Sequence, residues 1–530
     1  MTKTLYNRIK HLLLPCLAFS VITGVLSALI ITLFKILAEW VIHFSFTIYG
    51  TVRENPVFLP LLILGVAAIG LAASILLSLS HGCKGGGIPT SVAAIRGIVR
   101  FHWISSLLLL PLSALMTFLA GLPLGTEGPC VQMGTAIGDG VVHCVGKEKH
   151  KGWRRYVMTG GASAGFAIAT TSPISAILFS MEELHKHFSP MLLSVASLSV
   201  IAAQATAQLL SLFGFGETVF FHVFPLAALP PSLFFAPLLV GLVSGAASIL
   251  YTHLYHLVDH LMHFVLKRVS SKVVLPLLFA LTALVGFFLA DALGTGHSLV
   301  SALLSSHAAW YMLLLLFLLR AIGMMFSNTS GVTGGVFLPT LAFGAILGAL
   351  CAKGMIALGW IGAEYYMLMI VLGIASFLGA TSRIPLTACV FAVETLGGIH
   401  TVLPIVMATT VALLIVEATG LEDFTDTVIN AKMRKLTKNK KPLTVEVPLT
   451  VALHSFAIDK ELRDILWPNS CVVLSYSHAE WQPENVGIAA GDVITVRYVT
   501  YDPAATAKEL KALVGEQSEE AMRLMLPTLS

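Results

Sequence analysis

Charged residues are scarce in this chain of 530 residues. Asp, Glu, Lys and Arg together supply 11% of the sequence, whereas 56% is hydrophobic and the mean hydropathy is +0.86. Soluble domains carry about 25% charged residues, so a single soluble globular domain is excluded. Apolar runs long enough to cross a hydrocarbon core, roughly 20 residues each, recur along the chain. They include residues 57–79, 103–122, 232–250, 273–290 and 309–326. The sequence therefore predicts an all-α polytopic membrane protein.

Cysteine is also sparse, and the seven cysteines show no metal-ligand spacing. Most lie in apolar surroundings, which favours small core residues over disulfides. No nucleotide P-loop, nucleophile elbow or zinc-hydrolase motif occurs. We therefore expect no enzymatic activity, no cofactor and no nucleic-acid partner. Four histidines recur at helical spacing in YTHLYHLVDHLMH (251–263). They could bind zinc or respond to pH, but no further ligand is evident, so interfacial histidines are the favoured interpretation.

Charge is distributed unevenly, which divides the chain into two parts. Residues 1–420 hold 33 charged residues (20 basic and 13 acidic), and residues 421–530 hold 27 (12 basic and 15 acidic). The second part is therefore an ordinary soluble region attached to a membrane body. We place the membrane domain at residues 1–430, a basic linker at residues 431–442 and a C-terminal domain at residues 443–530.

Two pairs of segments match at nearly the same separation, which indicates an internal duplication. ATTSPISAILFSME (169–182) matches TSRIPLTACVFAVE (381–394) at an offset of 212 residues. Upstream, GTEGP (125–129) and GGVFLP (334–339) each place a proline after a glycine-containing turn, at an offset of 210 residues. Chance similarity among apolar segments is the alternative, but the agreement of both offsets favours a duplication.

The two copies differ in charge, which predicts opposite orientations in the membrane. GKEKHKGWRR (146–155) follows the first motif and carries five basic residues, so we expect it on the cytoplasmic side. Its counterpart, ALGWIGAEY (357–365), carries none. The two halves, about residues 12–210 and 232–418, are therefore predicted to form an inverted repeat. Such proteins place their substrate site near the membrane midplane, where interrupted helices of both halves meet.

Three glycine-proline segments interrupt the apolar runs: GGGIP (85–89), GTEGP (125–129) and GGVFLP (334–339). Proline is favoured in the first turn of a helix, and glycine lets the backbone approach a ligand closely. Each segment therefore predicts a helix N-terminus whose free amides bind anions. A single such segment would be a packing kink, but three favour an anion pathway. The residues that define the motifs are Gly85, Gly87, Ile88, Pro89, Gly125, Gly128, Pro129, Gly334, Gly335 and Pro339.

In order and spacing, these motifs and the segments ILFSMEE (177–183) and SRIPLTACVFAVE (382–394) resemble the CLC family of chloride channels and chloride/proton exchangers. The resemblance covers roughly residues 10–430. It implies a homodimer with one anion pore in each subunit, which exchanges chloride or a similar monovalent anion for protons. It also implies a bound chloride at the helix-start amides of Val336 and Phe337.

Glu127 is the only acidic residue between Glu54 and Asp139, and it stands at a predicted helix start. A carboxylate there mimics the conducted anion, and on protonation it loses its attraction to the amides. An acid in an apolar membrane setting is usually functional; the alternative is a carboxylate that serves only as a helix cap. The resemblance implies that Glu127 is the external gate and proton-transfer glutamate.

Two acids follow one another in ILFSMEELHKH (177–187). Glu182 matches Glu394 in the repeat, which indicates an architectural pair. Glu183 has no acidic counterpart, and the resemblance implies that it is the internal proton-transfer glutamate. Channel-type members usually have no acid at this position, so its presence favours an exchanger. An ordinary helix-end glutamate is the alternative.

Two positions depart from the family pattern. The first motif usually reads GSGIP, with a serine hydroxyl touching the anion, and here Gly86 stands in its place. Near the end of the membrane domain the family often has a tyrosine, which we match to Thr425 in GLEDFTDTVI (420–429). Both positions are candidates for anion contact. They leave a passive gated anion channel open as the alternative to chloride/proton antiport.

The C-terminal region reads as a small α+β domain. Strands are predicted at residues 443–449, 471–477 and 492–499, with a strand-turn-helix over residues 455–468. The pattern resembles the TrkA-C domain, which implies a small-ligand sensor and a bacterial origin; a structural dimerisation module is the alternative. Because the linker is basic, the C-terminus is expected in the cytoplasm. We expect a bacterial inner-membrane protein with both termini cytoplasmic.

Overall fold

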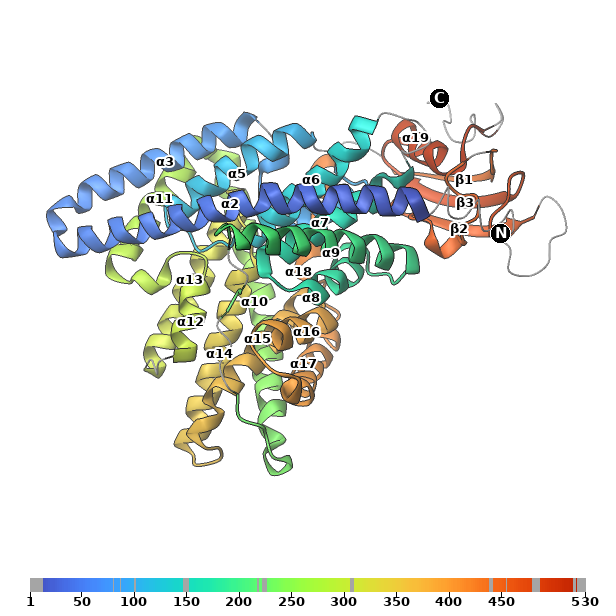
Figure 1. Ribbon diagram of the computed structural model, residues 1–530. Helices are drawn as coiled ribbons and strands as arrows, with labels where there is room; N and C mark the ends of the chain where they lie inside the picture. Colours follow the sequence, from blue (N-terminus) through green and yellow to red (C-terminus); the bar gives the residue numbers. More distant parts are fainter. Residues whose placement is uncertain are drawn as a thin grey trace.

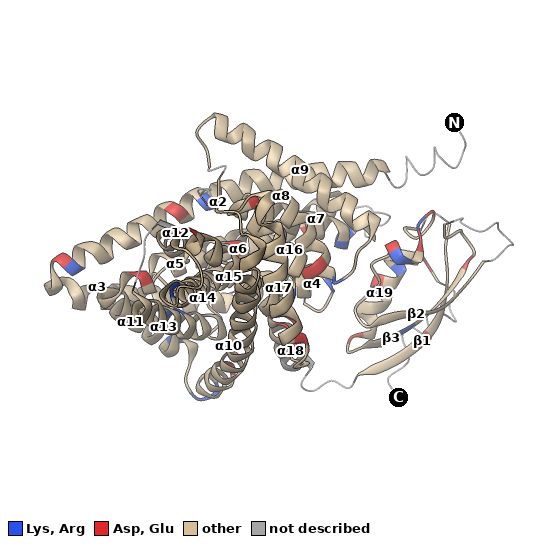
Figure 2. Cartoon of the chain, turned by 90° about the horizontal axis from the view of Figure 1, so that it is seen from below, with Lys and Arg blue, Asp and Glu red and all other residues tan. Residues whose placement is uncertain are grey.

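The computed structural model describes residues 13–79, 81–85, 87–99, 102–145, 152–216, 219–221, 226–305, 309–437, 442–453, 455–478, 487–517 and 521. Gly86, the candidate anion contact of the first glycine motif, lies outside these residues. Figure 1 shows a large helical body joined to a small domain that contains a β-sheet. Nine helices of the described residues are long and apolar enough to cross a membrane. Charged residues are sparse along the helices of the body (Figure 2).

The helices of the body fall into the two predicted halves. The first half contains α2 (Leu14–Glu54), α3 (Leu59–Leu79), α4 (Ile88–Ile95), α5 (Trp103–Leu119), α6 (Glu127–Val145), α7 (Arg154–Thr170), α8 (Pro173–Phe179) and α9 (Pro190–Leu212). A π-helical turn, Ser180–His185, continues α8. The second half contains α10 (Phe235–Arg268), α11 (Ser271–Phe288), α12 (His297–Ser305), α13 (Trp310–Thr329), α14 (Phe337–Ala357), α15 (Tyr366–Ser382), α16 (Pro385–Thr395) and α17 (Val402–Glu417). A further helix, α18 (Phe424–Thr437), follows the predicted end of this half at about residue 418.

Small residues bring matching helix pairs of the two halves into close contact. In the first half, a Cβ on Gly134 of α6 would collide with the carbonyl oxygen of Gly161 in α7. In the second half, a Cβ on Gly344 of α14 would lie 2.5 Å from the carbonyl oxygen of Gly373 in α15. Close backbone approach at small residues is a common way for membrane helices to associate. These contacts recur at the offsets of 210 and 212 residues that the sequence predicted.

Glu182 and Glu394 join the halves by capping each other's helix. The carboxylate of Glu394 accepts hydrogen bonds from two backbone amides at the start of α8, including that of Ser175 at 3.0 Å. The carboxylate of Glu182 accepts from two amides at the start of α16, including that of Thr387 at 2.7 Å. Carboxylates stabilise helix N-termini because the free amides carry partial positive charge. The prediction of an architectural pair is confirmed.

The C-terminal domain contains the three predicted strands. They are β1 (Leu443–Thr450), β2 (Cys471–Ser477) and β3 (Val493–Thr500), which form an antiparallel sheet in the order β1-β3-β2. In the register, Val496 of the central strand lies opposite Val447 on one side and Val473 on the other. One helix, α19 (Pro503–Val514), packs beside the sheet.

The predicted strand-turn-helix at residues 455–468 is wrong. The described residues of this segment form turns and a short 3-10 helix, Leu462–Asp464. The backbone leaves the helical region at Ile465, which is extended with φ −90° and ψ 122°, so the helical turn ends after Asp464.

The C-terminal domain packs against the body at the start of α7. The ring of Phe456 lies with its centroid 5.4 Å from that of Trp153 and 5.6 Å from that of Tyr156. Arg155 forms an ion pair of 2.5 Å with Glu509 of α19. These contacts combine buried aromatic area with charge, so the domain is held to the helices and is not merely tethered to them.

Candidate anion and proton pathway

The three glycine motifs meet backbone to backbone. A Cβ on Gly87 would lie 3.0 Å from the Cα of Gly128, and one on Gly128 would lie 2.6 Å from the Cα of Gly335. Gly125 and Gly335 exchange two backbone hydrogen bonds of 2.7 Å. Gly87 also has a φ of +129°, which favours glycine. The predicted helix starts, those of α4, α6 and α14, therefore converge at one place from both halves of the chain.

Gln132 of α6 fixes the first glycine loop, although no sequence motif marks it. Its side chain is fully buried, accepts a hydrogen bond from the amide of Gly87 at 2.7 Å and donates to the carbonyl of Gly82 at 2.8 Å. The hydroxyl of Thr333 adds a bond of 3.0 Å to the carbonyl of Cys83. A glutamine in an apolar membrane helix is the signal that could have identified this role, because an unpaired amide would be costly there.

A small cavity lies at the starts of α4 and α14. It is lined by Ile88, Pro89, Phe179, Glu183, Val336, Phe337, Thr340, Thr381, Ser382, Ile384, Phe424 and Thr425. Val336 is the N-cap of α14 and Phe337 its first residue, and the first amides of a helix have no partner within the helix. The cavity thus brings together six of the predicted site residues: Ile88, Pro89, Glu183, Val336, Phe337 and Thr425. Such a cavity can hold a small anion.

Glu127 lies at the first position of α6 and is fully buried, but it does not line this cavity. Its carboxylate lies close to its own amide and to that of Leu338 in α14, and the hydroxyl of Thr126 approaches Oε1 at 3.4 Å. Oε2 has no hydrogen-bond partner among the described residues. The carboxylate therefore lies where two helix N-termini would attract an anion.

Glu183 is also buried, with only 2% of its surface exposed, so it is not an ordinary helix-end glutamate on the surface. The hydroxyl of Thr425 donates a hydrogen bond to Oε1. Oε2 has no partner in the part of the chain that the structure describes. The guanidinium of Arg96 donates to the backbone carbonyl of Glu183 at 3.3 Å and to the carboxylate of Asp426 at 3.1 Å. No sequence motif marks Arg96 or Asp426.

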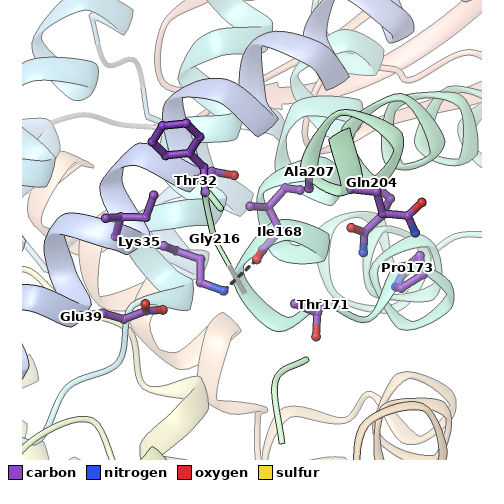
Figure 3. Close-up of a pocket in the computed structure, with 12 residues that line it drawn as sticks. Thr32, Lys35, Glu39, Ile168, Thr171, Pro173, Gln204, Ala207 and Gly216 are labelled. Carbon is purple, nitrogen blue, oxygen red and sulfur yellow. Dashed lines mark hydrogen bonds between the residues drawn. The ribbon is translucent and has the colours of Figure 1, made fainter. Parts of the chain in front are cut away.

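A second, larger cavity of about 170 Å³ lies between α2, the end of α7 and α9. Figure 3 shows the ammonium group of Lys35 turned toward the carbonyl of Ile168, with Glu39 further along α2. The Lys35 bond to this carbonyl is 3.2 Å long, and the cation also acts electrostatically on Glu127. Lysine within a membrane helix is costly and usually functional, and this rule could have identified Lys35 from the sequence.

The histidines of α10 show no metal site. Among the described residues, no group of three or more histidine, cysteine, aspartate or glutamate side chains is placed to hold a metal ion. The side chains of His253, His260 and His263 are exposed, and a ring nitrogen of His260 lies 2.8 Å from the carbonyl of His256. These histidines lie near the end of the long helix α10, where we expect the membrane–water interface.

The family model described as voltage gated chloride channel matches residues 68–417 of this sequence. The chain belongs to this family. The H(+)/Cl(-) exchange transporter ClcA of Yersinia pseudotuberculosis is 25% identical over 456 residues, which cover 84% of this chain and 94% of that protein. ClcA of Klebsiella pneumoniae is 27% identical over 358 residues, 66% of this chain and 74% of that protein.

Solved structures show the same fold. A slow cyanobacterial Cl-/H+ antiporter superposes with a TM-score of 0.71 at 20% identity, over 79% of this chain and 98% of that chain. A CLC-type fluoride/proton antiporter superposes with a TM-score of 0.65 at 23% identity, over 77% and 96%. The predicted CLC-type membrane fold is therefore confirmed, and the protein is an integral membrane protein.

Proposed function

We propose that this protein exchanges chloride, or a similar monovalent anion, for protons across the membrane. One observation carries the proposal. Two buried carboxylates, Glu127 and Glu183, lie near the converging helix starts, and each has one oxygen without a hydrogen-bond partner among the described residues. A passive pore needs one gate, whereas an exchanger needs a second acid to pass protons to the other side. The names of the bacterial relatives and of the similar structures also support antiport.

In this proposal the anion occupies the cavity at the amides of Val336 and Phe337. Thr425 lines the same cavity, and Gly86 belongs to the site on sequence grounds alone. Glu127 competes with the anion as long as it is ionised. When it is protonated it gains nothing from the positive helix ends and moves away, which opens the path. Protons pass between Glu127 and Glu183.

The remaining features of the proposal concern the whole protein. We place Glu183 and the C-terminal domain on the cytoplasmic side of a bacterial inner membrane. Arg154 and Arg155 begin α7 where it meets the C-terminal domain, and the linker sequence is basic. We propose a homodimer with one pathway in each subunit. The C-terminal domain is proposed to be of TrkA-C type and to bind a small ligand.

The test is anion flux from proteoliposomes with pH recorded in parallel. Antiport predicts proton movement against a gradient when an anion gradient is imposed, whereas the alternative, a passive gated channel, predicts anion flux without coupled protons. We expect Glu127→Gln to abolish proton movement and leave an anion flux that no longer depends on pH. We expect Glu183→Gln to stop proton movement but spare anion flux.

Glu364→Gln, at an exposed glutamate in a short 3-10 helix, serves as the control and should behave like wild type. Unchanged proton pumping in Glu127→Gln would remove this residue from the mechanism. Equal loss of both fluxes in Glu183→Gln would assign that residue a purely structural role.

A further inference from the structure

A cleft of about 450 Å³ opens between the membrane body and the C-terminal domain, close to Glu183. The body supplies one wall, from the end of α4 and the turn that follows Glu183. Residues 462–470 of the C-terminal domain supply the other wall. The basic side chains that line it are Arg96, Arg155, His185, Lys186, His187 and Arg463. The cleft gives water access to the charged groups that surround the buried end of the pathway.

The charges that line this cleft are balanced by carboxylates. Each of the four Lys and Arg side chains forms an ion pair; the pairs are Arg96–Asp426, Arg155–Glu509, Lys186–Asp423, Lys186–Asp426 and Arg463–Glu461. The cleft therefore lacks the uncompensated positive charge that a site for a polyanion would need. Two of its lining cations, Lys186 and Arg96, also act electrostatically on Glu183.

Lys186 reaches from the cleft to the start of α18. Its φ of +52° turns the chain back after the π-helical turn, so that Nζ contacts a carboxylate oxygen of Asp423 and one of Asp426, the latter at 2.5 Å. The Lys186 side chain is 38% exposed, whereas that of Asp423 is only 3% exposed. The cation thus faces the cleft, and the carboxylate of Asp423 is buried behind it.

Asp423 lies on the Glu183 side of this pair. It stands two residues before Thr425, whose hydroxyl is bonded to Glu183, and it acts electrostatically on Glu183 as a like charge. Lys186 and Arg96 act on Glu183 in the opposite direction. A like charge near a buried carboxyl favours its protonated form, and an opposite charge favours its ionised form. Burial has the largest effect on Glu183, and the balance between these charged groups then adjusts the pH at which it holds a proton.

The other titratable and charged groups around Glu183 come from each element packed on its turn. Asp426 stands at the start of α18 and is bonded to both Lys186 and Arg96. His185 is buried and hydrogen-bonded to Thr159 of α7 at 2.7 Å. Arg155 of α7 is held by Glu509. Of the two cations that act directly on Glu183, Lys186 is the more exposed in the cleft, at 38% of its side chain against 20% for Arg96.

We propose that Lys186 and Asp423 form a charge pair that sets the pH, on the side of the C-terminal domain, at which Glu183 takes up and releases its proton. The inference rests on the proposed role of Glu183. Neither residue of the pair carries the proton. Both are positioning residues, which act on Glu183 through their charges.

Two single variants should shift the pH dependence of coupled transport in opposite directions. Lys186→Met removes the cation, so Glu183 keeps its proton to higher pH and the midpoint of proton-coupled transport rises. Asp423→Asn removes the like charge, so the midpoint of proton-coupled transport falls. The asparagine side chain can still accept the hydrogen bond that the backbone amide of Asp426 donates to Asp423, so the local structure is kept. We expect each shift to be about one pH unit, the low end for a charge close to a carboxyl.

The measurement is proton-coupled anion flux in oriented vesicles, with pH varied only on the side of the C-terminal domain. Lys186→Arg should keep the wild-type midpoint, and the double variant Lys186→Met/Asp423→Asn should return close to it because the net charge is restored. Arg463→Met, on the opposite wall of the cleft, should not shift it. A merely structural role would change rates but would not give opposite shifts that cancel.

The outcomes separate this inference from the function on which it rests. Shifts in the same direction, or no shift, while Glu183→Gln still stops proton movement, would overturn the inference alone. Proton movement that survives Glu183→Gln would overturn the proposed role of Glu183 and the inference with it.

Discussion

Thr425 donates its hydroxyl to Glu183 inside the cavity, where a donor favours the ionised form of a carboxyl. The same hydroxyl is a candidate for anion contact, so one small side chain is shared between two proposed roles. At the scale of single residues, removal of the hydroxyl distinguishes the two roles. Loss of the bond to Glu183 would change the pH dependence of transport, whereas loss of an anion contact would weaken chloride binding.

Thr425→Val keeps the branched shape but removes the donor. A hydrogen bond to a charged group is worth about 1.5–3 kcal/mol, and about 1.4 kcal/mol corresponds to one pH unit. We therefore expect the midpoint of proton-coupled transport to rise by about one pH unit, whereas Thr425→Ser should match wild type. Flux assays over a pH series decide this. A normal pH profile together with weaker chloride binding in calorimetry would instead assign the hydroxyl to the anion.

Lys35 acts electrostatically on the other buried carboxylate, that of Glu127. Its cation attracts ionised Glu127, so Lys35→Met should let Glu127 be protonated at higher pH and should move the pH midpoint of anion flux upward. Lys35→Arg keeps the charge and should leave the midpoint in place. Anion flux measured against pH on the side of Glu127 is the test. An unchanged or lowered midpoint in Lys35→Met would show that the cation only caps the end of α7.

At the scale of elements, the two halves are joined where α8 and α16 exchange caps. Each carboxylate accepts two amide hydrogen bonds and one hydroxyl hydrogen bond from the opposite helix, the hydroxyls being those of Ser175 and Thr387. The equivalence of the two caps follows from the duplication, and it predicts equivalent energetic effects.

Glu182→Gln and Glu394→Gln should lower stability to a similar extent. Glutamine keeps one acceptor oxygen but loses the charge at the helix start, so we expect a loss of about 1–2 kcal/mol for each. The fraction of protein that stays monodisperse after heating in detergent gives the measurement. Glu417→Gln, in an ion pair whose carboxylate side chain is 52% exposed, should have little effect. A clear difference between the two cap variants would contradict their equivalence.

At the scale of the whole molecule, the C-terminal domain buries a lysine against the membrane body. Nζ of Lys460 lies 3.9 Å from the ring centroid of Phe456 and 5.7 Å from that of Trp153. Burial lowers the pKa of Lys460 from the ordinary 10.5 to about 8, although Asp459 and Asp464 partly offset it. Between these pH values the unfolded chain binds more protons than the folded chain.

The free energy of unfolding should therefore rise with pH over this window, because stability increases wherever the unfolded state binds more protons. Below this pH window, the destabilisation caused by burying the charged Lys460 is constant, at about 3 kcal/mol. We expect thermal unfolding, followed by tryptophan fluorescence, to move to higher temperature from about pH 8 to about pH 10. Lys460→Met should be more stable at neutral pH and lose most of this dependence. A pH profile identical to wild type would show that Lys460 is solvated in the folded protein.

The sequence by itself determined the membrane class, the helix starts, the position of Glu127 and the three strands of the C-terminal domain. These features depend on local physics: apolar length, glycine and proline in the first turn, and alternation along a strand. The strand-turn-helix at residues 455–468 was wrong, because the backbone becomes extended at Ile465 and the helical turn ends after Asp464.

Only the tertiary structure decided which groups act on the two acids. Lys186 is three residues from Glu183, but its partner Asp423 is 237 residues away, and Thr425 reaches Glu183 across 242 residues. Gln132 likewise gains its role only because α6 carries it to the first glycine loop. No sequence pattern indicates that Lys186, Asp423 and Thr425 lie near one another in the folded protein. The effect of each on a buried carboxyl depends on distance and dielectric surroundings, and folding sets both by bringing remote segments together.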